Sequence, residues 1–473
     1  MPVEIAEPKT GDRGPEDESR PGTPATTDPP GAADAAPAAA DAELRGKVDA
    51  APARASAITA RALDVPLRRN RDFLILLFGQ GISALGDAVS FIALPLLVLQ
   101  LTGSGLAMGI VGVLGRAPDL LFGLPAGVLA DRVDRRRLML LSDAARAALT
   151  ALIPLSAVAG LPTMGVILLV TFPINAFRVL FMSGWTAAVP NLVGRRDLGR
   201  AVSAVEGLVS LSFVAGPAIA GILVGVVGAT ETIAIDAASF AFSAATLMLI
   251  RRPFQAQRTT QPAGFLREMR EGMSFITHHP VLRLAVGIWT GGGIVTAGLI
   301  VALTFAITVD RHLPAEALGF VLSAYGIGNL VGAVAGGRFT HGPLAPPFLG
   351  GYLVQALAIL AVGVPMPVPL VLLFVAAFAG GLGSGFTIVA YLTYRAAATP
   401  DRLLGRVGST ARTISIGLQP IGMVATGILL DTIGGNLTVL LTGAALLAVT
   451  LLAALSPTLR AARGDAHPDH STA

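Results

Sequence analysis

The sequence predicts an all-α membrane protein, with twelve transmembrane helices arranged as two pseudo-symmetric six-helix bundles. Hydrophobic residues make up 53 % of the 473 residues and charged residues only 14 %, whereas soluble proteins carry roughly 25 % charged residues. Twelve apolar stretches are each long enough to cross about 30 Å of hydrocarbon. Short motifs also recur in the two halves of the chain at a nearly constant spacing.

Composition also excludes several classes of function. The absence of cysteine excludes disulfides, thiolate metal sites and cysteine nucleophiles. Neither of the two lysines, Lys9 and Lys47, lies in a phosphate-binding loop, so we expect no ATP hydrolysis of that kind. No metal-ligand set, nucleophile triad or cofactor loop is present in the sequence. We therefore expect no enzyme activity, no metal and no cofactor, and the scattered arginines do not indicate nucleic-acid binding.

Residues 1–65 begin the chain without apolar periodicity. This stretch is rich in Pro, Ala, Asp and Glu and has few large apolar side chains. It buries too little surface to offset the entropy lost on ordering. We therefore expect a disordered cytoplasmic tail, and no signal peptide, because no apolar segment follows the N-terminus closely.

The twelve apolar stretches then follow in order. In lipid, backbone polar groups must be satisfied within the segment, so each stretch is expected to be a helix, some with kinks at Pro118, Pro173, Pro217 or Pro420. The predicted spans are 73–100, 105–129, 138–159, 163–186, 203–226, 230–250, 282–308, 315–337, 347–365, 368–393, 408–430 and 435–456.

The arginines between these spans predict the orientation. The loops and ends on one predicted side hold 21 arginines, and those on the other side hold one, Arg311. Because arginine and lysine concentrate on the cytoplasmic side of membrane proteins, both termini are expected in the cytoplasm.

An internal repeat divides the spans into six and six. At an offset of 206 residues, Gly216 matches Gly422 and Gly221 matches Gly427; at an offset of 210, Gly109 matches Gly319. The second copy is degenerate, with His341 standing where the first has Asp131. We therefore expect bundles over 66–250 and 282–456, joined by a connector at 251–281 and followed by a cytoplasmic tail at 457–473.

The connector contains an amphipathic stretch. Phe265, Met269, Met273 and Ile276 fall on one helical face, and Arg267, Glu268, Arg270 and Glu271 fall on the other. Such a helix lies in the membrane interface or tethers two bundles.

The loop at 127–137, GVLADRVDRRR, resembles the loop signature of the major facilitator superfamily. Asp134 departs from the general pattern, which has glycine, but it is common in the branch of macrolide-efflux and siderophore-export proteins. The stretches GQGISALGDAVSFIALPLLV and LTGSGLAMG resemble that branch too. Gly216-Pro217 and Gly221 resemble part of an antiporter motif, whereas the RxxxG signature is not met after Arg178.

The resemblance implies that this loop is a gate. Gly127 would let the second span approach its neighbour closely, and Asp131 would face the N-terminus of the eleventh span, whose partial positive charge favours an anion. The alternative is that the arginines only fix topology. The full set of predicted gate residues is Gly127, Asp131, Arg132, Arg135, Arg136, Asp143, Arg146, Arg178, Glu206 and Arg412.

Charged residues inside spans are candidates for proton or substrate binding, because charge at bilayer depth is costly. Asp87 lies near the middle of the first span and is either a protonation site or a carboxyl bonded to Ser83 or Ser90. Arg116 lines the cavity, pairs with Asp87, or is neutralised by Asp119 three residues later. Asp236, in the sixth span, is a further proton candidate.

The second half has almost no charge within its spans. Polar-tipped aromatics and amides would line its side of a cavity for a bulky, mostly apolar ligand, although each is equally a packing residue. These are Trp289, Tyr325, Asn329, Gln355, Tyr391 and Tyr394.

Together these features predict a secondary transporter of the plasma membrane that works by alternating access. The resemblance implies export of a bulky amphiphilic small molecule, such as a drug, antibiotic or siderophore-like compound, by proton antiport. The expected partners are the lipid bilayer, the substrate and protons, without ATP. Uptake or facilitated diffusion of a nutrient is the alternative within transport, and a non-transporting sensor or scaffold is the alternative outside it.

Overall fold

The structure is a computed structural model that describes residues 66–462, apart from Leu124, 194–195, 251–253, 255–264, 340–342 and Pro367. The predicted tail at 1–65 and the end of the chain from 463 lie outside the described residues, as do His341 and most of the connector before Phe265.

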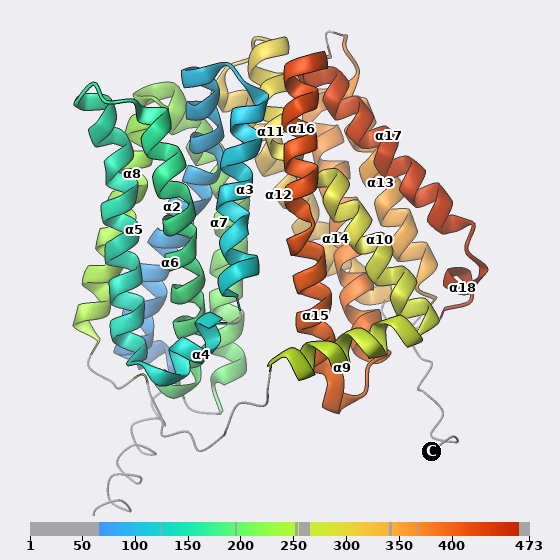
Figure 1. Cartoon of the computed structure of the whole chain (residues 1–473), viewed down its shortest axis with the longest axis horizontal. Coiled ribbons are helices and arrows are strands. Elements are labelled where there is room, and N and C mark those ends of the chain that lie inside the picture. Colours follow the sequence, from blue (N-terminus) through green and yellow to red (C-terminus); the bar gives the residue numbers. More distant parts are fainter. Residues whose placement is uncertain are drawn as a thin grey trace, which may run out of the picture. The chain divides into compact units, whose positions relative to one another are not determined.

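The N-terminal half consists of α2 to α8 (Figure 1). Its elements are the 3₁₀ turn η1 Leu67–Arg69 and the helices α2 Arg71–Thr102, α3 Gly105–Phe122, α4 Pro125–Arg132, α5 Arg135–Val158, α6 Thr163–Leu192, α7 Leu198–Val227 and α8 Ala229–Leu249.

Helix α9, Phe265–His278, leads into the C-terminal half, which runs from α10 to α17 (Figure 1). The remaining elements are α10 Pro280–Thr296, α11 Leu299–Phe305, the π-turn η2 Ala306–Asp310, α12 Ala315–Gly336, η3 Gly337–Phe339, α13 Ala345–Gly363, α14 Leu370–Ala397, η4 Asp401–Leu403, α15 Leu404–Gly417, α16 Gln419–Ile433, α17 Gly435–Ala454 and α18 Pro457–Arg460.

In the described part of the chain, twelve helical spans are long and apolar enough to cross a membrane, which confirms the predicted fold class. Two of them are interrupted. The seventh is divided near Gly298 between α10 and α11, and the eleventh at Leu418 between α15 and α16. Pro420 lies in the first turn of α16, where a missing N–H is tolerated, so the predicted kink takes the form of a helix restart.

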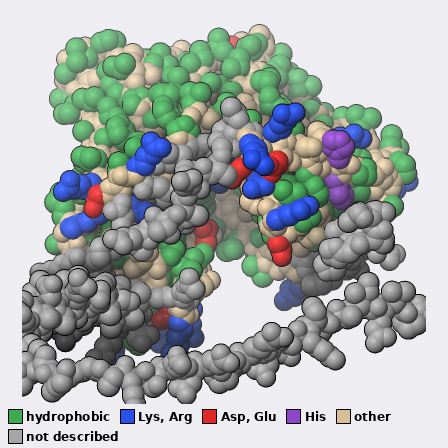
Figure 2. Space-filling view, turned by 60° about the horizontal axis from the view of Figure 1, so that its bottom comes forward, with side chains coloured by type: hydrophobic (Ala, Val, Ile, Leu, Met, Phe, Trp, Pro, Cys, Tyr) green, Lys and Arg blue, Asp and Glu red, His purple; other side chains and the backbone are tan. Residues whose placement is uncertain are grey.

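The two ends of the membrane spans carry different elements. The connector face is the end with α4, α9 and η4; the opposite face is the other end (Figure 1). Arginine side chains gather on the connector face over both halves, as Figure 2 shows. Large apolar side chains cover much of the remaining surface, as expected for helices that contact lipid.

The two halves meet mainly through two pairs of helices, α7 with α12 and α3 with α16. Glycines bring the backbones together in both places. A Cβ built on Gly319 would lie 3.1 Å from the Cα of Gly221, and one built on Gly109 would lie 3.4 Å from the Cα of Gly427. All four positions belong to the parts of these helices nearer the opposite face, so the halves are joined on that side.

A carboxylate strengthens this joint. Asp431, near the end of α16, accepts hydrogen bonds from Ser104 Oγ at 2.9 Å, Gly105 N at 2.5 Å and Leu106 N at 3.1 Å. These donors form the first turn of α3, whose free N–H groups and partial positive charge favour an anion. Asp431 therefore caps a helix of the other half.

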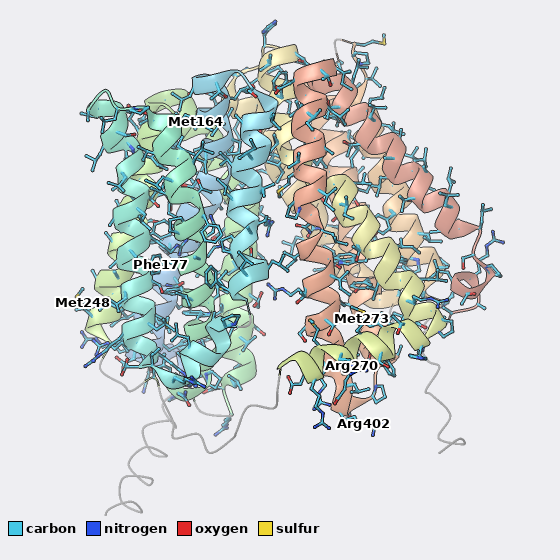
Figure 3. The ribbon with its side chains drawn as sticks, in the orientation of Figure 1. Met164, Phe177, Met248, Arg270, Met273 and Arg402 are labelled. Atoms are coloured by element: carbon cyan, nitrogen blue, oxygen red, sulfur yellow. The ribbon has the colours of Figure 1, made fainter. Side chains whose placement is uncertain are left out.

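Helix α9 packs against α15 on the connector face. Gly272 approaches the Arg406 carbonyl, and Glu271 forms an ion pair with the Arg406 guanidinium. Ile276 is buried, but Met273 is 38 % exposed, and Figure 3 shows it on α9 beside Arg270. Of the predicted apolar face, Ile276 is thus buried while Met273 is partly exposed, and Gly272 makes the close contact with α15.

Candidate functional site: a buried charge cluster in the N-terminal half

One buried arginine lies at the centre of the N-terminal half. Arg146 of α5 forms an ion pair with Asp87 of α2, with Nη2 to Oδ1 at 2.5 Å. Its Nη1 also lies 3.5 Å from Asp143, one turn earlier on the same helix. The guanidinium stacks on the ring of Phe240 of α8, 3.8 Å from the centroid. Three helices are thus linked through a single side chain.

The members of this cluster differ greatly in exposure. The side chains of Arg146 and Asp143 are 3 % and 0 % exposed, whereas that of Asp87 is 42 % exposed. Asp143 also accepts a hydrogen bond from Ser243 Oγ at 2.6 Å. Asp87 is therefore the member from which an ion or proton in solution reaches the buried arginine.

A third carboxyl group, that of Asp236 on α8, is buried with only neutral hydrogen-bond donors in contact. Ser90 Oγ donates to it at 2.5 Å and Ser239 Oγ at 3.1 Å. Gly86 allows this approach of α2 to α8, because a Cβ there would collide with Asp236 Oδ1 and with Ser239. One arginine thus faces three carboxyl groups, two of them buried, and burial of two carboxylates beside one cation is unfavourable unless one carries a proton.

These contacts correct two sequence predictions. Asp87 pairs with Arg146 and not with Arg116, and Ser90 donates to Asp236 rather than to Asp87. Sequence spacing gave no sign of either contact, because the partners are separated by 59 and 146 residues. Phe240, Ser239 and Ser243 were not predicted as members of the site, since serine and phenylalanine are ordinary residues in an apolar span.

A second ion pair links α3 to α6. Asp119 pairs with Arg178 at 2.6 Å, and Arg178 Nε donates to Asn175 at 3.2 Å. Asp119 is thus engaged mainly across helices, rather than with Arg116 on its own helix as predicted. Within the part of the chain that the structure describes, Arg116 forms no ion pair.

The predicted gate loop lies at α4 and the start of α5, and its arginines bind backbone carbonyls. Arg135 donates to Ala130 and Phe254 at 3.4 Å each. Arg136 donates to Leu247 at 3.1 Å and Met248 at 2.7 Å, at the end of α8. Carbonyls at a helix C-terminus lack partners within the helix, so Arg136 fixes the start of α5 to α8. Arg132 is exposed.

Other gate predictions have different outcomes. Gly127 is not a point of close approach, because a Cβ there would meet no atom within 4 Å; that prediction is wrong for this conformation. The side chain of Asp131 lies outside the described residues. Glu206 and Arg412 are both exposed, and among the described residues neither forms an ion pair.

The six predicted cavity residues lie mostly inside the C-terminal half. Trp289 stacks on Tyr391, with centroids 4.6 Å apart and ring planes 5° apart. Asn329 donates to Ser384 at 3.2 Å, and Gln355 donates to the Tyr325 hydroxyl at 3.3 Å. Tyr391, Tyr394 and Gln355 are buried. Most of these side chains therefore pack helices together in this conformation.

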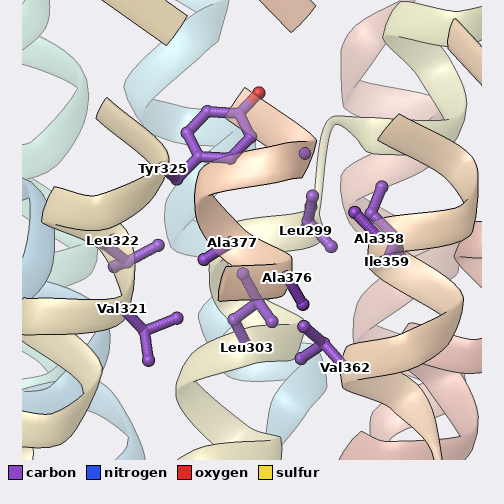
Figure 4. A pocket seen from close by; sticks show the side chains of 11 residues that line it. Leu299, Leu303, Val321, Leu322, Tyr325, Ala358, Ile359, Val362, Ala376 and Ala377 are labelled. Atoms are coloured by element: carbon purple, nitrogen blue, oxygen red, sulfur yellow. The ribbon is translucent and has the colours of Figure 1, made fainter. Parts of the chain in front are cut away.

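Of these six, only Tyr325 lines an apolar pocket between α11, α12, α13 and α14 (Figure 4). Its free volume is about 30 Å³, so the pocket is small in this conformation. Its other walls are aliphatic: Leu299, Leu303, Val321, Leu322, Ala358, Ile359, Val362, Ala376, Ala377 and Gly380.

Comparison with known proteins identifies the family of this chain. The family described as transmembrane secretion effector matches residues 64–471. The multidrug efflux pump Tap of Mycolicibacterium fortuitum is 28 % identical over 407 residues, which cover 82 % of this chain and 96 % of the pump. Macrolide efflux protein A of Streptococcus pyogenes is 26 % identical over 390 residues, covering 79 % of this chain and 93 % of that protein.

Solved structures agree on the fold. A bacterial homologue of the human lysosomal transporter Spinster, in an inward-facing and unoccupied conformation, superposes with a TM-score of 0.66 at 13 % identity. That match covers 84 % of this chain and 97 % of the other. The nucleoside transporter NupG gives a TM-score of 0.66 at 12 % identity, over 81 % and 98 % of the two chains. The chain is a membrane transporter rather than an enzyme, and it belongs to the transmembrane secretion effector family of the major facilitator superfamily.

Proposed function

We propose that this transporter exports bulky amphiphilic small molecules across the plasma membrane in exchange for protons. The two relatives named above are efflux proteins for drugs and macrolides, which supports export. The observation that supports the coupling is the cluster of Asp87, Asp143 and Asp236 around the buried cation of Arg146.

An antiporter needs a protonation site that is accessible from only one side of the membrane at a time. We assign this role to the cluster. In this conformation the Asp87 carboxylate is paired with Arg146 and partly exposed. A proton that binds to Asp87 removes its charge and weakens the pair, so Arg146 then depends on Asp143 for charge balance. Because Asp87, Arg146 and Asp236 join α2, α5 and α8, this change repacks helices within one half.

The orientation follows from the arginines. The connector face carries nearly all of those between the spans, so we infer that it faces the cytoplasm, with both termini on that side. The halves are joined near the opposite face, and towards the connector face neither Glu206 nor Arg412 forms an ion pair with another described residue. This arrangement corresponds to a conformation open to the cytoplasm, ready to accept substrate for export.

The apolar character of the C-terminal half supports the proposed substrate class. Its pocket is aliphatic apart from Tyr325, and its spans contain few charges. Such surfaces bind apolar groups with one or two polar contacts. A large, mostly apolar molecule with a polar group suits this surface better than a small hydrophilic nutrient does.

The test is proton movement in proteoliposomes with an imposed pH gradient, using a panel of macrolides, other lipophilic drugs and siderophore-like compounds. We expect addition of a substrate to dissipate the gradient, and Asp87→Asn to abolish this effect. Asp401→Asn removes an exposed carboxylate on the connector face and is the matched control. Substrate movement that leaves the gradient unchanged in the native protein would show facilitated diffusion or another coupling ion, and would refute antiport.

A further inference from the structure

Three polar atoms on one face of α5 are buried and have no hydrogen-bond partner among the residues that the structure describes. They are the hydroxyls of Ser142 and Thr150 and the Nε of Arg146. These residues are 1 %, 4 % and 2 % exposed. They follow one another at intervals of four residues, so they share one helix face and span about 12 Å along the axis. A buried polar atom without a partner is unfavourable, and ordered water is the usual solution.

Helix register places this face against the carboxyl groups of α8. Asp143 bonds to Ser243, and Arg146 stacks on Phe240. Residue numbers thus increase along α5 in the direction in which they decrease along α8, so the two helices are antiparallel neighbours. The same register sets Thr150 level with Asp236, and Ser142 beside the pair of Asp143 with Ser243.

The helix backbone adds an acceptor at Thr150. Pro154 lies within α5, four residues after Thr150. Proline has no N–H to donate to that carbonyl. The Thr150 hydroxyl, the Thr150 carbonyl and the carboxyl of Asp236 therefore lie at one level. A buried water needs two to four polar partners, and this level supplies three.

We propose that ordered water molecules, held at Ser142 and at Thr150, form a proton path inside the N-terminal half, separate from the space between the halves that the substrate crosses. This inference rests on the proposed proton antiport and extends it. Each transfer moves one proton from a protonated water (hydronium) to a carboxylate oxygen and leaves neutral water, or runs in reverse, while Arg146 keeps its own proton. The charged groups along the path are Asp87 from α2, Asp143 and Arg146 from α5 and Asp236 from α8.

Removal of the water-holding hydroxyls tests the path. Ser142→Ala and Thr150→Val keep nearly the same volume but remove the hydroxyl. Because one hydrogen bond changes the occupancy of a bound water by about fivefold to tenfold, we expect substrate-driven proton flux to fall by that factor. Substrate–substrate exchange without a gradient requires no proton and should keep its rate.

Matched controls are buried hydroxyls already bonded to their own helices. Ser156 of α5 donates to the Ile153 carbonyl at 2.7 Å, and Thr171 of α6 donates to the Ile167 carbonyl at 2.6 Å. Both are 3 % exposed. Ser156→Ala and Thr171→Val should leave proton flux unchanged. Equal flux in the native protein and in both path variants would overturn the proposal.

A second measurement does not depend on transport. The chain has no cysteine, so a Thr150→Cys variant carries one thiol. If water reaches it, Ag⁺ should react with this thiol at least tenfold faster than with that of a Thr171→Cys variant. Equal rates would overturn the water path. If the native protein moves no protons but Thr150→Cys still reacts quickly, antiport fails while the buried water stands.

Discussion

The capping of α3 by Asp431 predicts how the equilibrium between the two access states responds to mutation. Asp431 joins the halves only when they are closed on the opposite face, because its three partners all lie in the first turn of α3. Opening that face separates α16 from α3 and breaks all three hydrogen bonds. Asp431→Ala should therefore shift the population towards the state open on the opposite face.

The size of the shift follows from the geometry of the cap. Replacement of a helix-capping side chain by alanine costs about 1 kcal/mol in typical cases. A carboxylate that accepts three hydrogen bonds should contribute more than this value. However, Asp431 is exposed, so solvent screens the additional electrostatic contribution of its charge. A change of about 1 kcal/mol alters the ratio of the two states roughly fivefold.

Distance measurements between two spin labels detect this change. Arg200 in the N-terminal half and Arg402 in the C-terminal half are exposed on the connector face, and a cysteine at each accepts a label without competition, since the chain has none. Asp431→Ala should increase the short-distance population about fivefold, and Asp431→Asn should give a smaller increase. An unchanged distribution, or the same change with the control Asp401→Ala, would refute the capping argument.

Three further predictions concern stability and pH. Gly86→Ala should destabilise the protein by about 1–3 kcal/mol through a clash with α8, measured as a lower melting temperature in detergent. Gly127→Ala is the control and should have no effect, because its Cβ meets no atom within 4 Å. Glu271→Gln should weaken the docking of α9 by about 0.5 kcal/mol, so amide exchange in α9 should rise about twofold; no change would show that the ion pair is inert. Burial lowers the pKa of His279, and its neutral Nδ1 accepts the Leu282 N–H at 3.1 Å. This cap is fully present above about pH 6.5, the pKa of histidine in the unfolded chain, and is lost as the pH falls through the lower pKa of the folded state. Amides in the first turn of α10 should therefore exchange faster at pH 5 than at pH 7.5, after correction for intrinsic rates. His279→Asn, which caps at both pH values, should abolish that difference.

The sequence was sufficient for the fold because each relevant signal is local or periodic. Span length and apolar composition predict the helices, and the glycines repeated between the halves predict the division into six and six. The broken spans were less visible. Gly298 is one of 55 glycines, and nothing in its neighbours distinguishes a helix break from a packing contact.

The site was only partly predictable, for a physical reason. A charge within an apolar span must find a partner, so Asp87 and Arg146 stood out individually. Which charges pair depends on which faces of α2, α5 and α8 meet, and this is fixed by packing between distant segments. The choice of Arg116 as a partner for Asp87 failed for that reason. The serines failed to stand out because a hydroxyl gives no signal until the carboxyl group beside it is known.

The joint between the halves has a symmetry that its repeats explain. Gly109 and Gly319 are equivalent in the two repeats, as are Gly221 and Gly427, and the contacts pair Gly109 with Gly427 and Gly319 with Gly221. Two equivalent positions thus contact each other's counterparts, which is the pattern of an isologous dimer interface. One chain therefore contains the joint of a two-fold dimer, with an axis of rotation between its two glycine contacts. Because backbone meets backbone at both points, no large side chain must be withdrawn when the halves separate or close at this joint.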